Sequence, residues 1–170
     1  IYGNYTNRVL SLIDKYYEGK IPNPDNLNDN DTKILSEVIS EKNDIESNLN
    51  QFKFREALKS LINIARIGNK YLADTEPWKI KNENPERVEQ ILKTSFEIVS
   101  YLAVLSEPFI PFTSEKLKKM IGLNKSEWSN LDNLGDEIDF SFTITNKEML
   151  FRRIEDSEIE FQISKLKNDT

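Results

Sequence analysis

Two short stretches of the sequence carry side chains that could bind another molecule. The first is a polar row in which Arg8, Ser11 and Lys15 follow one another at spacings of three and four residues, extended by Asn4 and Asn7. Residues at these spacings share one face of a helix, where their hydroxyl, amide and cationic groups could form hydrogen bonds together. Polar exteriors are the rule for helices, so the row taken alone is also typical of a solvated face.

The second stretch is centred on Trp78, which directly follows Pro77. The proline ring fixes the direction of the backbone and leaves the indole on a stiff turn. There the indole either fills a hydrophobic gap or lies partly exposed as a stacking surface. Taken alone, the high average burial of tryptophan favours the first of these interpretations.

The composition excludes most catalytic chemistry. The chain of 170 residues contains no Cys and no His, so it lacks thiolate nucleophiles, disulfides, Cys/His metal sites and the usual acid-base residue of neutral pH. Its 29 acidic residues are spread along charged helix faces, with no pair in an apolar setting that would separate two pKa values. We therefore expect no independent active site.

The net charge of −6 argues against a protein that coats nucleic acid by charge alone, so any RNA contact must be local. No apolar run approaches the roughly 18 residues of a membrane span, and no signal peptide is apparent. These features predict a cytoplasmic protein with no membrane partner. The chain starts at Ile1, inside an apolar pattern and without an initiator Met, so we expect a fragment of a longer protein.

Apolar residues at helical spacing predict five helices, at about residues 5–19, 31–49, 53–72, 84–105 and 113–122. Residues 29–31 offer an N-cap to the second helix, Asn84 and Pro85 start the fourth, and Thr113 or Ser114 starts the fifth. Gly122 is a plausible end of the fifth helix. The fourth helix is apolar around more than one stripe, which predicts that it is the central element.

The pattern loosens after residue 122. Phe140, Phe142 and Ile144 alternate with polar residues, which indicates either a short strand or an extended arm against the helices. Asp156 or Ser157 could cap a last short helix. The sequence thus predicts an all-α protein: an antiparallel bundle of about five helices over residues 1–122, and a short irregular C-terminal extension over residues 123–170 that packs on it.

Several motifs together resemble a known family, the anticodon-binding helical bundle of methionyl-tRNA synthetases. The opening residues 3–9 (GNYTNRV), 15–17 (KYY) and 19–22 (GKIP) resemble the start of that domain. The later motifs follow in the same order: FREAL at 54–58, GNKY at 68–71, EPWK at 76–79, EPFIP at 107–111 and FRRIE at 151–155. The discriminating unit is the asparagine-tyrosine-proline-tryptophan combination, which shifts the interpretation of Trp78 from core plug to base-stacking platform.

The resemblance implies that the domain receives the anticodon loop of the methionine tRNA. Trp78 matches the stacking tryptophan of the family, while Ser11 and Lys15 match its base-edge readers. The best-known version has Asn and Arg at these two positions, whereas Ser offers a single short hydroxyl and Lys lacks the planar fork that binds two acceptors at once. This difference from the family leaves three alternatives: recognition at Ser11 and Lys15 is weaker, it is mediated by water, or it is shared with Asn7 and Arg8.

The resemblance also implies partners and cofactors outside this stretch. The parent enzyme would be a methionine-tRNA ligase that uses ATP with Mg²⁺, with Zn²⁺ in its catalytic domain, whereas this fragment would hold no cofactor. Its partners would be the tRNA and the enzyme's own catalytic domain. The competing hypotheses are the equivalent domain of an isoleucine, valine or leucine synthetase, and a helical protein-interaction bundle with no RNA role.

Overall fold

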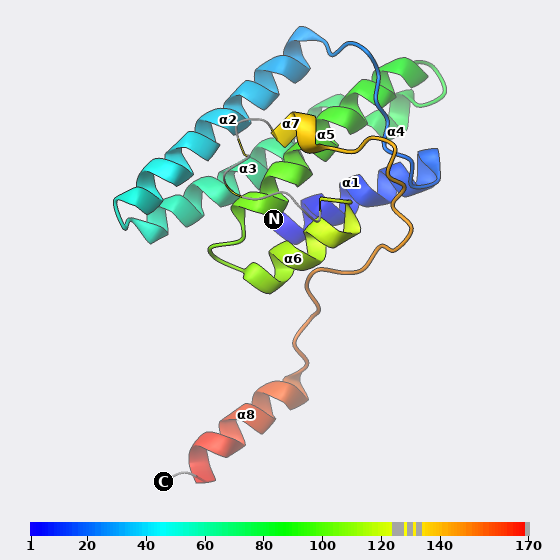
Figure 1. Cartoon of the computed structure of the whole chain (residues 1–170). Helices are drawn as coiled ribbons and strands as arrows, with labels where there is room; N and C mark the ends of the chain where they lie inside the picture. The colour runs from blue at the N-terminus through cyan, green and yellow to red at the C-terminus, as the bar shows by residue number, and fades with distance from the viewer. Residues whose placement is uncertain (124–127, 129–130, 132–133, 169–170) are drawn as a thin grey trace.

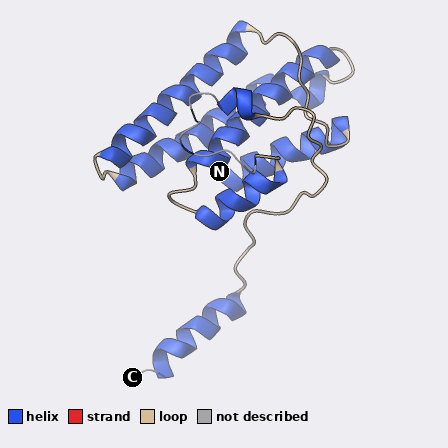
Figure 2. Cartoon of the chain, in the orientation of Figure 1, coloured by secondary structure: helices blue, strands red, loops and turns tan. Residues whose placement is uncertain are grey.

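The chain forms helices in a computed structural model that describes residues 1–123, 128, 131 and 134–168. The long helices are α1 (Tyr2–Tyr17), α2 (Asp29–Asn50), α3 (Phe54–Thr75) and α5 (Pro85–Leu105), and the shorter ones are α4 (Pro77–Ile80), α6 (Pro111–Met120), α7 (Leu134–Glu137) and α8 (Asp156–Asn168). Figure 2 shows helices joined by loops, and the described residues contain no strand. The predicted all-α class is confirmed. No helix in this described part is long and apolar enough to cross a membrane.

Helix α5 lies at the centre of the bundle. Every side chain from Ile98 to Leu105 is buried, so this part of the helix is covered on all sides. It contacts α1, α2, α3, α4, α6 and α7, and Figure 1 shows α2 and α3 as an antiparallel pair beside it. The central position predicted for this helix is confirmed.

Helix α1 is anchored by one aromatic ring. Tyr5 is fully buried, and its ring lies so close to Gly68 of α3 that a Cβ atom at position 68 would come within 2.3 Å of a ring carbon. The Tyr5 hydroxyl donates a hydrogen bond to the carbonyl oxygen of Ser95 in α5, at 3.1 Å. This single side chain therefore joins α1 to both α3 and α5.

The start of α2 differs from the prediction, because the N-cap is Asn28 and not a residue within 29–31. The side chain of Asn28 accepts a hydrogen bond from the backbone N–H of Asp31 at 2.9 Å, and the Asp31 carboxylate accepts one from the Asn28 N–H at 3.3 Å. This reciprocal arrangement is a capping box. Asp31 thus belongs to the first turn of the helix, with its second oxygen directed into the protein.

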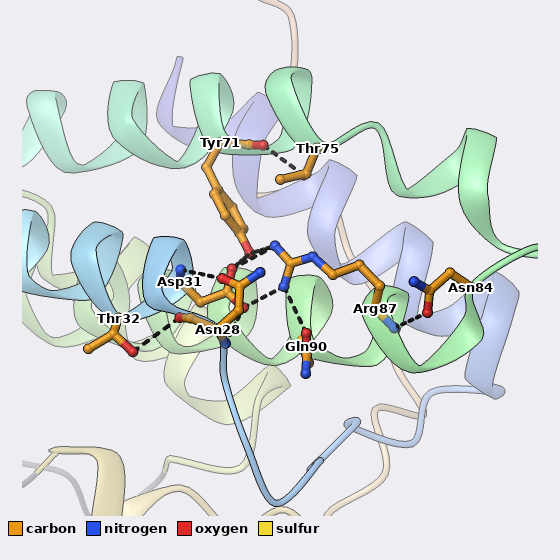
Figure 3. A network of polar contacts seen from close by, with 8 residues as sticks. All are labelled: Asn28, Asp31, Thr32, Tyr71, Thr75, Asn84, Arg87 and Gln90. Atoms are coloured by element: carbon orange, nitrogen blue, oxygen red, sulfur yellow. Dashed lines mark hydrogen bonds and ion pairs between the residues drawn. The ribbon is translucent and has the colours of Figure 1, made fainter.

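Asp31 is also the centre of a buried polar network, drawn in Figure 3. Its fully buried carboxylate accepts hydrogen bonds from Arg87 of α5, at 2.5 and 2.8 Å, and from the hydroxyl of Tyr71 of α3, at 2.5 Å. Burial alone would raise the pKa of Asp31, but the hydrogen bonds from Arg87 and Tyr71 outweigh that effect and lower it. The network ties α2, α3 and α5 together.

Helix α6 begins earlier than the predicted Thr113 or Ser114. Its first residue is Pro111, whose missing N–H has no helical partner in the first turn. Ser114 has a different role: it is buried, and its hydroxyl donates to the carbonyl oxygen of Ala103 at 2.6 Å. Gly122, with a φ of 79°, lies just beyond the helix end as predicted.

The segment after α7 lies against the bundle as an extended arm and not as a strand. The Ile144 N–H donates to the Gly19 carbonyl oxygen at 2.9 Å, beside an isolated bridge between Lys20 and Thr143. Gly19 has a φ of 81°, and a Cβ atom there would lie 2.3 Å from the Ile144 oxygen. The predicted last helix is confirmed as α8, which Figure 1 shows standing away from the bundle. The division of the chain at residue 122 stays a prediction.

The contact between Tyr5 and Gly68 can be tested by adding one methyl group. Gly68→Ala should lower the free energy of unfolding by about 1–3 kcal/mol, because the ring must move to admit the Cβ atom. Urea denaturation would measure the loss. Gly135→Ala in α7 is a matched control, because nothing lies within 4 Å of a Cβ atom there. An equal effect of both substitutions would contradict the proposed steric cause.

The Asp31 network predicts a defined pH dependence. Because folding lowers the pKa of Asp31, its stabilising contribution is present above the ordinary aspartate value of about 3.9 and is lost as the pH falls through the lower folded value. Asp31→Asn should cost roughly 3 kcal/mol near pH 7, since it leaves Arg87 without its charge partner. The stability difference between the two proteins should narrow below about pH 4 in urea titrations. A constant difference down to pH 3 would rule out this account.

Candidate nucleic-acid interface

The two faces of α1 separate as the sequence predicts. Tyr5, Val9 and Ile13 are fully buried against the bundle. On the other side of the helix Asn7 and Lys15 are exposed, and Ser11 between them is partly exposed. The packing of the apolar stripe therefore fixes which polar side chains α1 presents to solvent.

Trp78 is held at a corner between two helices. Helix α3 ends at Thr75, Glu76 takes a left-handed conformation with a φ of 42°, and the buried Pro77 opens α4. Proline suits the first position of a helix because its φ is already helical. Trp78 follows on this short helix with 40% of its surface exposed. The indole is therefore not a core plug, and part of its surface is open for stacking.

Arg8 connects α1 to this corner. Its guanidinium carbon lies 5.6 Å from the ring centre of Trp78, within the range of a cation–π contact. Its Nη1 donates a hydrogen bond to the side-chain oxygen of Asn69 in α3, at 3.3 Å. The Asn69 amide nitrogen in turn donates to the Ala65 carbonyl oxygen at 2.9 Å, which fixes the amide so that its oxygen faces Arg8. Asn69 thus positions Arg8 over the indole.

A solvent-open hollow of about 370 Å³ lies between α1 and the indole. Its lining is formed by all five residues predicted as the binding site, together with one apolar residue: Asn7, Arg8, Ser11, Lys15, Trp78 and Leu12. Asn4, which extends the polar row in the sequence, lines a different hollow with Gly3 and Phe151. The structure therefore brings the five predicted residues together around one space, as a base-binding site would require.

Local charge at the hollow is positive, although the chain has a net charge of −6. Arg8 and Lys15 belong to the lining, and none of the lining residues is acidic. Asp14 pairs with Lys147 of the C-terminal arm at 3.2 Å, and Glu76 pairs with Lys79 at 2.8 Å. Because the whole chain is acidic, a polyanion such as RNA could bind only at a locally positive surface, and the hollow provides one.

Two residues of this region were not predicted from the sequence as site residues. Leu12 is apolar, so its type gave no sign that it would line the hollow beside Trp78. Asn69 was visible only as part of the GNKY motif, and its contact with Arg8 spans 61 positions. That contact could be found only from the packing of α1 on α3.

Comparison with solved structures shows which class of domain has this fold. The apo form of Mycobacterium tuberculosis methionyl-tRNA synthetase superimposes with a TM-score of 0.81 at 21% sequence identity, over 89% of this chain and 31% of that one. Its complex with methionyl-adenylate gives a TM-score of 0.78 at 21% identity, over 89% of this chain and 30% of that one. The fold of this chain is thus shared with about a third of the length of these two methionyl-tRNA synthetase structures.

Sequence comparison identifies the family within this class. The family described as the anticodon binding domain of methionyl tRNA ligase matches residues 21–168. Methionine–tRNA ligase of Bacteroides fragilis strain YCH46 is 45% identical over 98% of this chain, and that of Cytophaga hutchinsonii is 45% identical over 99% of it. The chain belongs to the anticodon-binding domain family of methionyl-tRNA ligases. It spans 24% of the length of each of these relatives.

The contact between Arg8 and Trp78 can be followed through the indole itself. The chain contains two tryptophans, so a Trp128→Phe background leaves Trp78 as the single tryptophan emitter. In that background Arg8→Ala should increase quenching of Trp78 fluorescence by acrylamide, because the guanidinium no longer covers the ring. Asn69→Ala should act in the same direction, by releasing Arg8. Unchanged quenching in both variants would show that Arg8 does not shield the indole in solution.

Proposed function

We propose that the hollow beside Trp78 receives the unstacked bases of a tRNA anticodon loop, and that the chain recognises the methionine anticodon for a methionine–tRNA ligase. The observation that carries this proposal is the meeting of a part-exposed indole with five polar and apolar side chains around one open space. Single-stranded bases offer a flat face and hydrogen-bonding edges, so a site that reads them combines an aromatic ring with polar groups.

Different side chains would have different roles in this site. Trp78 would stack against a base, which is worth about 1–3 kcal/mol but discriminates poorly between bases. Ser11 and Lys15, one helical turn apart on the exposed face of α1, would contact base edges. Asn7 and Arg8 line the same space and would share that recognition. By this proposal, the ligase reaction with ATP, Mg²⁺ and Zn²⁺ takes place in a catalytic domain of the same enzyme. That domain would be the second partner of the chain, after the tRNA, and the enzyme would act in the cytoplasm.

The proposal separates tRNA charging from amino-acid activation. In the full-length ligase, Trp78→Ala should weaken tRNA binding by about 5- to 150-fold, the equivalent of 1–3 kcal/mol, because the stacking surface is lost. ATP–pyrophosphate exchange with methionine should stay close to the wild-type rate. Trp78→Phe is the matched control, since it keeps an aromatic face and should lose less affinity.

An equal loss in charging and in activation would contradict the proposed role, because it would show that the substitution disturbs the catalytic domain. Anticodon specificity provides the second criterion. Wild-type enzyme should bind a methionine tRNA transcript more tightly than the same transcript with an isoleucine anticodon. Equal affinities for the two transcripts would contradict anticodon recognition by this domain.

A further inference from the structure

A third cationic group lies close to the lining residue Lys15, outside the five residues discussed above. Lys81 directly follows α4, and its ammonium nitrogen lies 4.0 Å from the ring centre of Tyr16 on α1. The ammonium nitrogen of Lys15 lies 5.7 Å from the centre of the same ring. Two lysines from different segments therefore meet at one aromatic ring.

The cluster of Lys15, Tyr16 and Lys81 and the contact between Arg8 and Trp78 lie at two different positions along α1. Arg8 meets Trp78, and eight residues further along α1 Tyr16 meets Lys81, three residues after Trp78. At 1.5 Å per residue the two positions on α1 are about 12 Å apart. The hollow, with Ser11 and Leu12 in its lining, lies between them. A nucleotide in the hollow would thus have a cation at either end.

In the described part of the chain, the ion pairs near the cluster do not include its two ammonium groups. Asp14, the acidic neighbour of Lys15, is paired with Lys147, and Glu76 is paired with Lys79. Within the part of the chain that the structure describes, neither Lys15 nor Lys81 forms an ion pair with a carboxylate. An aromatic ring attracts an ammonium group without cancelling its charge, so the Tyr16 ring holds Lys81 in place while leaving it able to bind an anion.

We propose that Lys81, held by the Tyr16 ring, binds a backbone phosphate of the nucleotide whose base occupies the hollow. This inference rests on the proposed anticodon recognition and deepens it. Lysine is a compact point charge with three donors, which suits a phosphate oxygen. Phosphate contacts position the RNA and carry no sequence information. Lys81 therefore contributes to affinity and to the placement of the loop, and Lys15 remains the group at the base edge.

The salt dependence of tRNA binding tests this role in the full-length ligase. Affinity for labelled methionine tRNA, measured by fluorescence anisotropy over a KCl series, gives the slope of log K against log salt. Lys81→Gln should reduce the magnitude of this slope by about 0.7, the value for one phosphate of a single strand. The corresponding loss of affinity is about five-fold at 0.1 M KCl relative to 1 M. Lys81→Arg should preserve the slope.

Lys79→Gln is the matched control. It removes the same charge two residues before Lys81, but Lys79 is already paired with Glu76. Its slope should equal that of the wild type. Tyr16→Leu keeps the lysine and removes the ring, and should lower the slope in the same direction as Lys81→Gln. In all these variants the affinity ratio between methionine and isoleucine anticodons should stay at the wild-type value.

Three results would overturn the inference. The slope could be unchanged in Lys81→Gln, it could fall equally in Lys79→Gln, or anticodon discrimination could fall with Lys81→Gln. The second result would indicate a diffuse effect of charge, and the third would indicate base reading. A wild-type enzyme that failed to discriminate between anticodons would instead contradict the proposed function, so the two failures are distinguishable.

Discussion

The close contact between the Tyr5 ring and Gly68 determines how the rest of the site is built. The ring occupies the space that any other side chain at position 68 would fill, so α1 and α3 approach as closely as a glycine permits. The buried phenol is hydrogen-bonded to the Ser95 carbonyl oxygen, and burial raises its pKa, so it remains a donor. With Tyr5 fixed, the rotation of α1 about its axis is fixed too, and the polar row must face outward.

The Asp31 network also fixes the C-terminal end of α3, close to Gly68. Tyr71 lies one turn beyond Gly68, and it joins α3 to Asp31 of α2 and, through that carboxylate, to Arg87 of α5. Thr75 closes the helix by donating its hydroxyl to the Tyr71 carbonyl oxygen at 2.7 Å. Trp78 follows three residues later, so the indole projects from a helix end that is anchored against three other helices. A stacking surface works best when it is rigid, because less entropy is then lost on binding.

Much of this could be predicted from the sequence, because the relevant signals are local. The stripe of α1, the Asn84-Pro85 start of α5 and the all-round apolar character of that helix each follow from the spacing of neighbouring residues. The five site residues also fall on two short segments, and the family motif linked them before any geometry was known.

The remaining features depend on contacts between distant residues. Asp31 resembled a cap in the sequence, and its pairing with Arg87, 56 positions away, showed why its carboxylate points inward. The short helix α4 has no periodicity to detect, because it is a single turn opened by Pro77. Leu12 and Asn69 could be assigned to the site only from the packing of α1 on α3. Local patterns therefore defined which face of each helix is polar, and tertiary packing defined which polar faces meet.

Tertiary packing also matters for Ser11 and Lys15, the two positions at which this chain differs from the best-known version of the family. Ser11 lacks the amide group, with its separate donor and acceptor, and Lys15 lacks the planar fork of donors, that Asn and Arg provide in the best-known version of the family. Arg8, however, lines the same hollow and carries such a fork, with only its Nη1 engaged by Asn69. Its guanidinium carbon lies 5.6 Å from the centre of the Trp78 ring, so its remaining donors are close to the proposed stacking surface. Under the proposed function, a planar donor group is present in this domain at Arg8, one turn before Ser11 and two turns before Lys15 on α1, and the short side chain of Ser11 leaves room for a base to reach it.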